Sequence, residues 1–356
     1  MNIGLIGLPQ SGKKTLLHLL TGVDARVTAP TNGVVPGICP VRDPRLGRLV
    51  AMYKPKKTAP ATIQYLLMPD LTKDSAKNQE LLTALATVDV LAHVARAFED
   101  DTVFHLDGSI DPLRDISTVQ AELILNDLLF VEKRLERIAK ETARRGGVDR
   151  AKEHALLTKL QTHLNENLPL RTLPLDAEED KVLSGASLLT RKPLLIILNV
   201  GEGKVGDTQL LAEVKARHTD QQIHLALVSA KIEEELAQLD DPKERAAFLQ
   251  ELGIAESAID QLTRVSYEAL GLVSYFTVGE DEVRAWTVHR GASAAQASGV
   301  IHSDIERGFI RAELMKYNDL MTLGSEQAVA SAGKAQLKGK EYIVEDGDIL
   351  NFRFNV

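Results

Sequence analysis

The sequence predicts an α/β protein built around a buried, largely parallel sheet. Residues 192–200 and 223–231 are apolar, strand-like runs that end in polar residues, as strands buried on both faces do. A third apolar run, residues 2–6, leads through a glycine-rich loop into a helix with apolar periodicity. Because open α/β sheets bind ligands at the carboxyl ends of their strands, we expect the functional residues at that edge.

The composition is that of a soluble globular protein. With 356 residues, 44% of them hydrophobic and 26% charged, the chain should form two or three domains. It has no apolar run long enough to cross a membrane and no basic segment before an apolar leader, so we expect a cytoplasmic protein. The single cysteine, Cys39, excludes an intrachain disulfide and a cysteine-based zinc site. The net charge of −8 argues against a general polyanion binder but allows a local basic patch.

The loop after the first strand matches a phosphate-binding pattern. Residues 7–15 read GLPQSGKKT, with Gly7, four residues, Gly12 and Lys13 in Walker A spacing. In such a loop the backbone N–H groups face the phosphates and Lys13 reaches the outer ones. The pattern then calls for a Ser or Thr that binds Mg²⁺, but this chain has Lys14, and the hydroxyl comes one residue later at Thr15. The alternative is a glycine-rich turn that binds no ligand.

The segments after the first helix occupy the places of the two switch regions of a phosphate-loop protein. Residues 23–44 are rich in Gly, Pro, Thr and Asn, which predicts a loop with short strands. Residues 62–68 predict a second strand, followed by Pro69 and Asp70. Asp70 is a candidate for a second Mg²⁺ anchor, and a turn or helix-capping role is the alternative. Residues 88–94 predict a third buried strand.

Two long amphipathic patterns predict a helical hairpin. Residues 118–140 and 151–164 have apolar side chains at three-to-four spacing, with a turn near residues 144–147. The hairpin is rich in basic residues, which either contact RNA phosphates or form a solvated helix face: Lys133, Arg134, Arg137, Lys140, Arg144, Arg145, Arg150 and Lys152.

The polar ends of the later strands predict a base-binding site. Asn199 with Glu202, and residues 229–231, stand where the base-reading loops of a phosphate-loop protein lie. After Gly271 the pattern changes to short strands at residues 283–288, 341–343 and 349–354. This change predicts a small α+β module of roughly eighty residues that contains Trp286.

Taken together, these motifs resemble the YchF or Obg-like ATPases of the translation-factor class of P-loop NTPases. The resemblance covers nearly the full chain and rests on GLPQSGKKT, NGVVP, DPRL, AHVARAFEDD, DGSIDPLRDI, NVGE and SAKIEEEL. The C-terminal stretches EVRAWTV, HSDIERGFIRAE and VEDGDILNFRFNV are its most specific part.

The resemblance implies three domains. They are a Ras-like P-loop NTPase domain formed by residues 1–116 and 185–274, an inserted antiparallel coiled-coil hairpin at residues 117–184, and a C-terminal ubiquitin-like β-grasp (TGS) domain at residues 275–356. Family members hydrolyse ATP slowly and bind ribosomes. For this chain the expected partners are therefore a purine nucleotide and the ribosome or ribosomal RNA, contacted by a monomer through the hairpin and the TGS domain. The residues expected to bind nucleotide are Gly7, Pro9, Gln10, Ser11, Gly12, Lys13, Lys14, Thr15, Asn199, Val200, Glu202, Ser229, Ala230 and Lys231.

The base-reading motif favours ATP over GTP. Related GTPases have Asn-Lys-x-Asp, whereas this family has Asn-x-x-Glu, here Asn199 and Glu202. Guanine offers an N1–H and a 2-amino group to a suitably placed carboxylate, and adenine has neither. When that carboxylate is moved, the N1–H and 2-amino group of guanine lose their acceptor. Each unpaired buried polar group costs about 1–3 kcal/mol in binding free energy, so the preference for guanine is weakened.

The departures from the family all affect metal and γ-phosphate binding. Lys14 replaces the Mg²⁺-binding Ser, Leu67 and Asp70 stand where the second switch motif has Asp and Gly, and both switch segments are shortened. We therefore expect a divergent member that keeps its nucleotide pocket but has weak or lost hydrolysis, with Thr15 and Asp70 as the remaining metal candidates. Lys14 would then replace part of the charge of Mg²⁺. A slow ATPase, a GTP switch and a ribosome- or RNA-binding protein that uses no nucleotide are the alternatives.

Overall fold

The chain folds into two units. The computed structural model describes residues 1–28, 33–72, 78–106, 108–142, 148–218 and 222–355. The first unit, called the N-terminal unit, consists of Met1–Ile38 and Gln64–Val265. The second, the C-terminal unit, consists of Cys39–Ile63 and Ser266–Val356. This division into two units does not test the boundaries expected for three domains, which remain predictions.

The N-terminal unit is organised by a six-stranded sheet with the order β2-β4-β1-β5-β6-β7. Its strands are β1 (Asn2–Ile6), β2 (Val35–Pro40), β4 (Thr62–Leu67), β5 (Val90–Ala97), β6 (Leu194–Val200) and β7 (Ile223–Val228). β1 pairs in parallel with β4 and β5, and β6 pairs in parallel with β5 and β7. Every residue of β5 and β6 is buried, which explains their unbroken apolar pattern.

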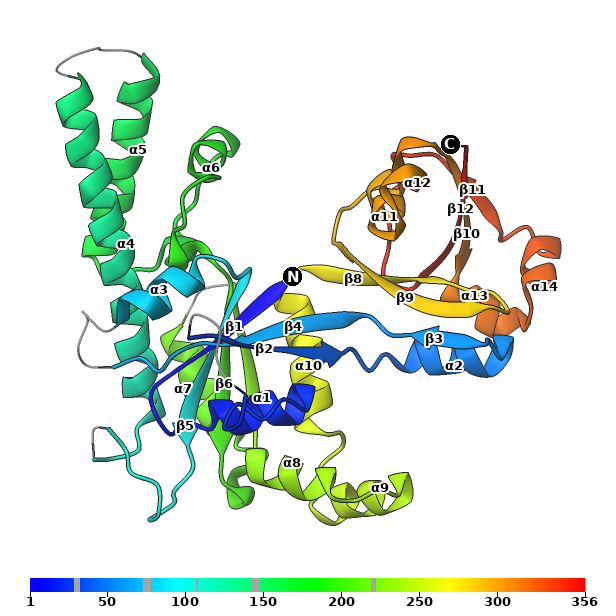
Figure 1. Ribbon diagram of the computed structural model, residues 1–356, viewed down its shortest axis with the longest axis horizontal. Coiled ribbons are helices and arrows are strands. Elements are labelled where there is room, and N and C mark those ends of the chain that lie inside the picture. The colour runs from blue at the N-terminus through cyan, green and yellow to red at the C-terminus, as the bar shows by residue number, and fades with distance from the viewer. Residues whose placement is uncertain (29–32, 73–77, 107, 143–147, 219–221, 356) are drawn as a thin grey trace. The chain divides into compact units, whose positions relative to one another are not determined.

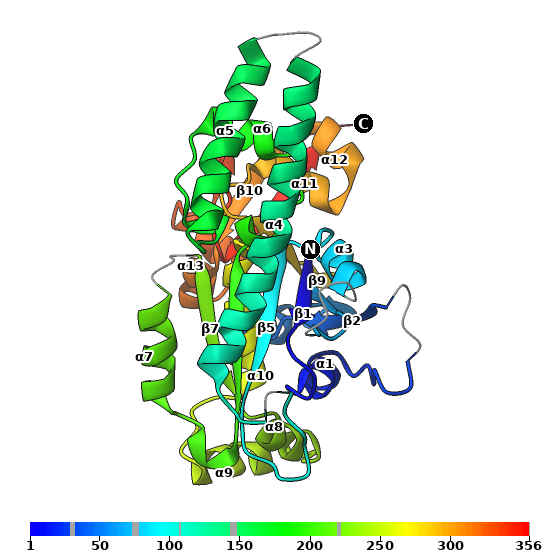
Figure 2. The same cartoon turned by 90° about the vertical axis from the view of Figure 1, so that its left-hand side faces the viewer.

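Helices cover both faces of this sheet (Figures 1 and 2). α3 (Gln79–Leu85), α4 (Pro112–Thr142) and α7 (Thr208–Arg217) pack apolar side chains into one core with β5 and β6. On the other face, α1 (Lys13–Thr21) lies beside α8 (Ala230–Ala237), and α9 (Pro242–Glu251) and α10 (Ala258–Ala269) follow along the chain. The strand predicted for residues 223–231 is too long, because β7 ends at Val228 and the backbone turns into α8.

The predicted helical hairpin is present. α4 and α5 (Val148–Asn165) run antiparallel, and Figure 1 shows their outer ends extending away from the sheet. A row of buried apolar side chains fills the seam between them: Ile124, Val131, Ile138, Leu156, Leu157, Leu160 and Leu164. The shorter elements η2 (Leu170–Thr172), α6 (Ala177–Leu183) and η3 (Leu189–Arg191) return the chain to the sheet. Arg144 and Arg145 lie outside the described residues.

The C-terminal unit is a β-grasp module. Its sheet has the order β11-β10-β12-β8-β9-β3, formed by β3 (Lys57–Ala59), β8 (Leu272–Thr277), β9 (Glu282–His289), β10 (Phe309–Lys316), β11 (Gln336–Lys338) and β12 (Asp348–Phe354). β8 and β9 form an antiparallel hairpin, and β12 runs parallel to β8 in the middle of the sheet. The predicted fold class, a Ras-like P-loop domain with a helical hairpin and a ubiquitin-like module, is therefore confirmed.

Two cores hold the sheet of the C-terminal unit. α11 (Ala294–Ile301) packs against one face, with α12 (Ser303–Arg307) following it along the chain. On the other face lie α13 (Tyr317–Leu323), α14 (Glu326–Ser331) and α2 (Pro44–Tyr53), which comes from early in the chain. The strand predicted at residues 341–343 is wrong. Apart from one isolated bridge between Ile343 and Ser293, this segment folds as turns, because Tyr342 N donates to Gly339 O and Glu345 N donates to the Asp348 carboxylate.

None of the helices in the described part of the chain is long and apolar enough to span a membrane.

Candidate functional site

The loop between β1 and α1 has the backbone conformation that its glycines allow. Gly7 and Gly12 have φ values of 148° and 94°, in the region that other residues rarely adopt. A Cβ on Gly7 would lie 2.5 Å from Val94 O, and a Cβ on Gly12 would lie 2.2 Å from Asn199 Nδ2. A larger residue at Gly7 would therefore collide with the backbone of β5, and one at Gly12 would displace the amide of Asn199 and strain the backbone.

Lys13 is folded into the loop that precedes it. Its side chain is 4% exposed, and its Nζ donates to Gly7 O at 2.9 Å and Leu8 O at 2.6 Å. The same Nζ lies 2.8 Å from Oδ1 of Asp70, which follows β4. Burial lowers the pKa of Lys13, and the Asp70 carboxylate opposes that shift. Asp70 therefore neutralises the ammonium of the loop in this structure.

Asn199, at the end of β6, ties the loop to a second segment. Its Nδ2 donates to Ser11 O at 3.1 Å, and its Oδ1 accepts from the backbone N–H of Ala230, the first residue of α8, also at 3.1 Å. The side chain is only 5% exposed, so both hydrogen bonds are largely shielded from water. One amide thus fixes the position of the phosphate loop relative to residues 229–231.

Beside Asn199 lies a cavity of about 740 Å³, here called the base cavity. The predicted residues Asn199, Val200, Glu202, Ala230 and Lys231 line it, together with Gln10, Gly12 and Thr15 of the loop and helix. Glu202 Oε1 and Lys231 Nζ are 2.5 Å apart. This hydrogen bond raises the pKa of Lys231. Ser229 is not among the lining residues, but it is 2% exposed and its Oγ has no hydrogen-bond partner among the described residues.

The far wall of the base cavity was not predicted. It consists of residues 98–101 and Val103, which follow β5. Arg96, 3% exposed, holds this segment by donating to Val103 O at 3.0 Å and Phe98 O at 3.2 Å, and its guanidinium lies 4.5 Å from the centre of the Phe98 ring. One feature of the sequence could have indicated this wall, namely an arginine inside an otherwise apolar strand. A buried arginine needs carbonyl or carboxylate partners, so the segment after the strand had to lie close to it.

A second cavity of about 460 Å³, the phosphate cavity, is lined by the loop itself and by residues that follow α1 and β4. Gln10, Gly12 and Thr15 line both cavities. The phosphate cavity also includes the predicted residues Pro9, Ser11, Lys13, Lys14 and Asp70. Leu67, and Ala25 and Arg26 from the segment after α1, line it as well. The structure thus brings the phosphate-loop and base-end predictions together around one loop. Lys14 is exposed, whereas Leu67 is buried.

The donor set of the phosphate cavity does not fit a Mg²⁺ ion. Its lining includes three cationic side chains, those of Lys13, Lys14 and Arg26, but one carboxylate, that of Asp70, which is bound to Lys13. Within the described ranges, no group of three or more His, Cys, Asp or Glu side chains is arranged so that it could hold a metal ion. Mg²⁺ prefers six oxygen ligands at short distances, and cations repel it. The cavity instead suits an anionic ligand.

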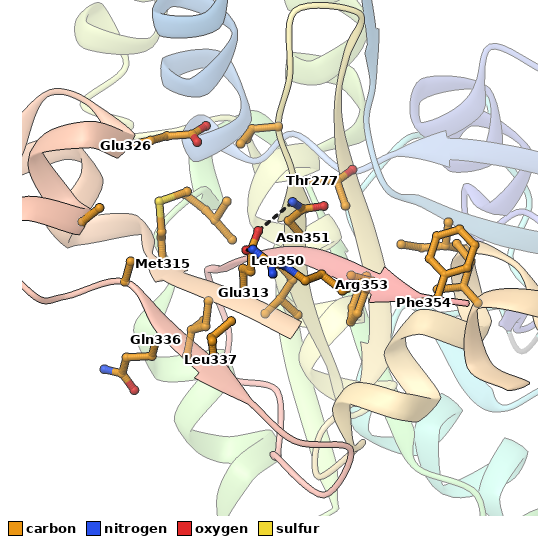
Figure 3. A pocket seen from close by; sticks show the side chains of 18 of the residues that line it. Thr277, Glu313, Met315, Glu326, Gln336, Leu337, Leu350, Asn351, Arg353 and Phe354 are labelled. Atoms are coloured by element: carbon orange, nitrogen blue, oxygen red, sulfur yellow. Dashed lines mark hydrogen bonds and ion pairs between the residues drawn. The ribbon is translucent and has the colours of Figure 1, made fainter. Parts of the chain in front are cut away.

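A third cavity, of about 720 Å³, lies on the sheet of the C-terminal unit and is called the sheet cavity (Figure 3). Residues of β8, β10, β12 and α14 line it, and Figure 3 shows Glu313 and Asn351 pointing toward each other. Glu313 accepts from Asn351 Nδ2 at 2.9 Å and also pairs with Arg353. Glu326 accepts from Tyr53 Oη at 2.6 Å. These polar groups thus satisfy one another.

Comparison with known proteins relates the whole chain to one family. The family model described as "YchF-GTPase_C: Protein of unknown function (DUF933)" matches residues 272–355. The chain is 41% identical to the "Ribosome-binding ATPase YchF" of Bacillus subtilis (strain 168), over 100% of both chains. It is 39% identical to the protein of that name from Escherichia coli O157:H7, over 99% of both chains.

A solved structure shows the same architecture. The chain matches the Schizosaccharomyces pombe YchF GTPase with a TM-score of 0.85 and 30% identity, covering 99% of this chain and 97% of that one. The likeness therefore extends through the N-terminal unit, the hairpin and the C-terminal module.

Proposed function

The chain belongs to the YchF family, and we propose that it binds a purine nucleotide at the phosphate loop and associates with ribosomes. The observation that carries the nucleotide proposal is the amide of Asn199. It links the phosphate loop to residues 229–231, and Gln10, Gly12 and Thr15 of that loop and its helix line both the base cavity and the phosphate cavity. Two observations support the same assignment: Gly7 and Gly12 have close neighbours where a Cβ would lie, and the buried Oγ of Ser229 has no hydrogen-bond partner within the described ranges.

ATP is the preferred nucleotide in this proposal. A guanine would need the carboxylate of Glu202 to accept from its N1–H and 2-amino groups, but Glu202 is engaged by Lys231 at 2.5 Å. Adenine has no N1–H and no 2-amino group, so it can bind while Glu202 stays paired with Lys231. The two side chains are 46% and 72% exposed, so solvent screens the pair and we expect a modest preference, of about tenfold or less.

Hydrolysis is weak or absent in this proposal. Phosphoryl transfer depends on positioned charges, usually with Mg²⁺ held by a hydroxyl and a carboxylate. In this chain Lys14 and the buried Leu67 supply neither group, and Asp70 is bound to Lys13. Lys14, exposed on the phosphate cavity, would take over part of the charge of the ion without orienting an attacking water.

The hairpin and the C-terminal module are proposed as the ribosome-facing parts of a monomer. Among the described basic residues of the hairpin, Arg134 lies 2.6 Å from Glu153, whereas Lys133, Arg137 and Lys140 are exposed on α4. Replacing these three with Gln should weaken ribosome pelleting and flatten its salt dependence. Unchanged pelleting at several salt concentrations would remove the hairpin from the contact surface.

An interaction protein that uses no nucleotide is the second candidate. The hydrogen bonds of Lys13 favour this candidate. Its ammonium already has two backbone carbonyls and the Asp70 carboxylate as partners. An entering phosphate would have to displace these partners.

Calorimetry with ATP and GTP, each with Mg²⁺ and with EDTA, tests the proposal. We expect ATP to bind more tightly than GTP, with little dependence on Mg²⁺ and phosphate release near background. Lys14→Ser should make binding more dependent on Mg²⁺ without restoring turnover. Clear GTP preference, or strong Mg²⁺ dependence with steady turnover, would contradict the account, and the lack of any nucleotide binding would favour the second candidate.

A further inference from the structure

Arg26, on the segment that follows α1, lines the phosphate cavity although no motif points to it. Its Nε and Nη2 donate to Oδ1 and Oδ2 of Asp24, both at 2.9 Å, and its backbone N–H donates to Oδ1 at 2.9 Å. The Arg26 hydrogen bonds lower the pKa of Asp24 to about 2, so the pair stays ionised at neutral pH. Asp24 thus holds the guanidinium from one side.

The guanidinium has capacity for a further ligand. A guanidinium has five N–H donors in a planar fork, and Asp24 engages the donors at Nε and Nη2. The Arg26 side chain is 72% exposed, so its outer edge faces solvent. Arginine binds phosphate oxygens through parallel hydrogen bonds, which gives it more directional affinity than a lysine has.

The charge and the free N–H donors of the phosphate cavity call for an anion. Of the three cations in its lining, Lys13 is neutralised by Asp70 at 2.8 Å. Asp24 balances the charge of Arg26 in the same way, so the excess positive charge of this cavity comes from Lys14. Arg26 adds N–H donors that Asp24 leaves free.

We propose that Arg26, together with Lys14, binds the outermost phosphate of a nucleoside triphosphate, and that Asp24 positions Arg26 for this contact. The proposal rests on the proposed nucleotide-binding function and adds to it a means of distinguishing ATP from ADP without a metal ion. The competing explanation is that Asp24 and Arg26 only close a local turn, because the same carboxylate also accepts from the backbone of Arg26.

The ratio of ATP to ADP affinity separates the two explanations. Calorimetry in EDTA would compare the full chain with Arg26→Gln, Asp24→Asn, the double variant and Arg264→Gln. Arg264 is the matched control, since it is an exposed arginine of the N-terminal unit that lies 2.7 Å from a carboxylate, that of Glu256, but lines neither cavity.

Arg26→Gln should weaken ATP binding about tenfold, as the loss of one charge-assisted phosphate contact does, and change ADP binding less than about twofold. Arg264→Gln should change neither. Asp24→Asn should weaken ATP selectively by a smaller factor, and the double variant should match Arg26→Gln, since a positioning residue acts only through its partner.

Each contrary result is distinct. If the unmodified chain binds ATP but Arg26→Gln keeps its ATP-to-ADP ratio, the role of Arg26 is wrong and the proposed function stands. If the double variant shows additive losses, Asp24 acts independently of Arg26. If the unmodified chain binds no nucleotide, both the inference and the proposed function fail.

Discussion

The base cavity of the N-terminal unit and the sheet cavity of the C-terminal unit differ little in size, at about 740 and 720 Å³, but differ in construction. The base cavity lies at the carboxyl ends of parallel strands, next to glycines with positive φ. Nearby in the chain is the buried hydroxyl of Ser229, which has no hydrogen-bond partner in the described part of the structure. In the sheet cavity, Glu313 pairs with Arg353 and Asn351, and Glu326 pairs with Tyr53. Volume therefore does not distinguish the two cavities, whereas the glycine-dependent backbone path at the ends of parallel strands does.

Gly12→Ala should have the largest effect on the base cavity. The new Cβ would meet Asn199 Nδ2 at 2.2 Å in a backbone conformation unfavourable for alanine. The resulting strain and the broken tie should lower ATP affinity roughly 100-fold. Gly203→Ala is the control, because a Cβ there meets nothing within 4 Å. If calorimetry gives equal ATP affinities for the two variants, the proposed role of the loop is wrong.

Lys316→Met, in the C-terminal unit, should lower the free energy of unfolding without changing ATP affinity. Lys316 Nζ lies 2.6 Å from Oδ1 of Asp348, whose side chain is fully buried. Removing the ammonium leaves a buried carboxylate without its ion partner, which should cost about 3 kcal/mol in the free energy of unfolding. Lys340→Met, at a side chain 73% exposed, should cost little. Denaturant unfolding measures both effects, and a loss of ATP affinity in folded Lys316→Met would contradict the separation of the two sites.

His93 should make the N-terminal unit sensitive to acid. Burial, aided by the charge of Lys13, lowers the pKa of His93 from 6.5 to about 3. The folded state therefore holds the imidazole neutral, while the unfolded chain takes up a proton below pH 6.5. Stability should fall by about 1.4 kcal/mol per pH unit from pH 6.5 down toward pH 3 through this group. In His93→Leu that part of the slope should vanish, and an unchanged slope would show that the imidazole is not held neutral.

Lys231→Met should have the smallest effect, on base selectivity. Without Lys231, the carboxylate of Glu202 is free to accept from guanine, so the ratio of GTP to ATP affinity should rise about threefold, within the range of an exposed ion pair. Lys204→Met, an exposed lysine of the neighbouring turn, should leave the ratio unchanged. A fall in the ratio after Lys231→Met would mean that Lys231 itself supports guanine binding.

The sequence predicted the parts of the site that follow strong local rules. Glycine spacing located the phosphate loop, and apolar strands with polar ends placed Asn199 and Glu202 at the same edge as Gly12. The contacts between distant segments could not be predicted. Nothing in the spacing of Lys13 and Asp70 shows that they pair, and the role of Arg96 depends on the path of the segment after β5.

Fold prediction failed where pairing partners lie far apart in the chain. β3 is a three-residue strand, Lys57–Ala59, with little apolar character, and its parallel pairing with β9 joins it to the C-terminal sheet. A short polar strand has no periodicity to reveal it, and only its partner determines where it lies. Residues 39–63 therefore belong to the C-terminal unit although they follow the phosphate loop in the chain.

The central claim, that nucleotide binds at the phosphate loop and not on the sheet of the C-terminal unit, is tested most directly by amide hydrogen exchange with and without ATP in EDTA. The account predicts slower exchange in residues 7–15, 98–103 and 199–202, with no change in residues 313–315 and 349–354, which line the sheet cavity. Slower exchange confined to residues 313–315 and 349–354 would contradict it.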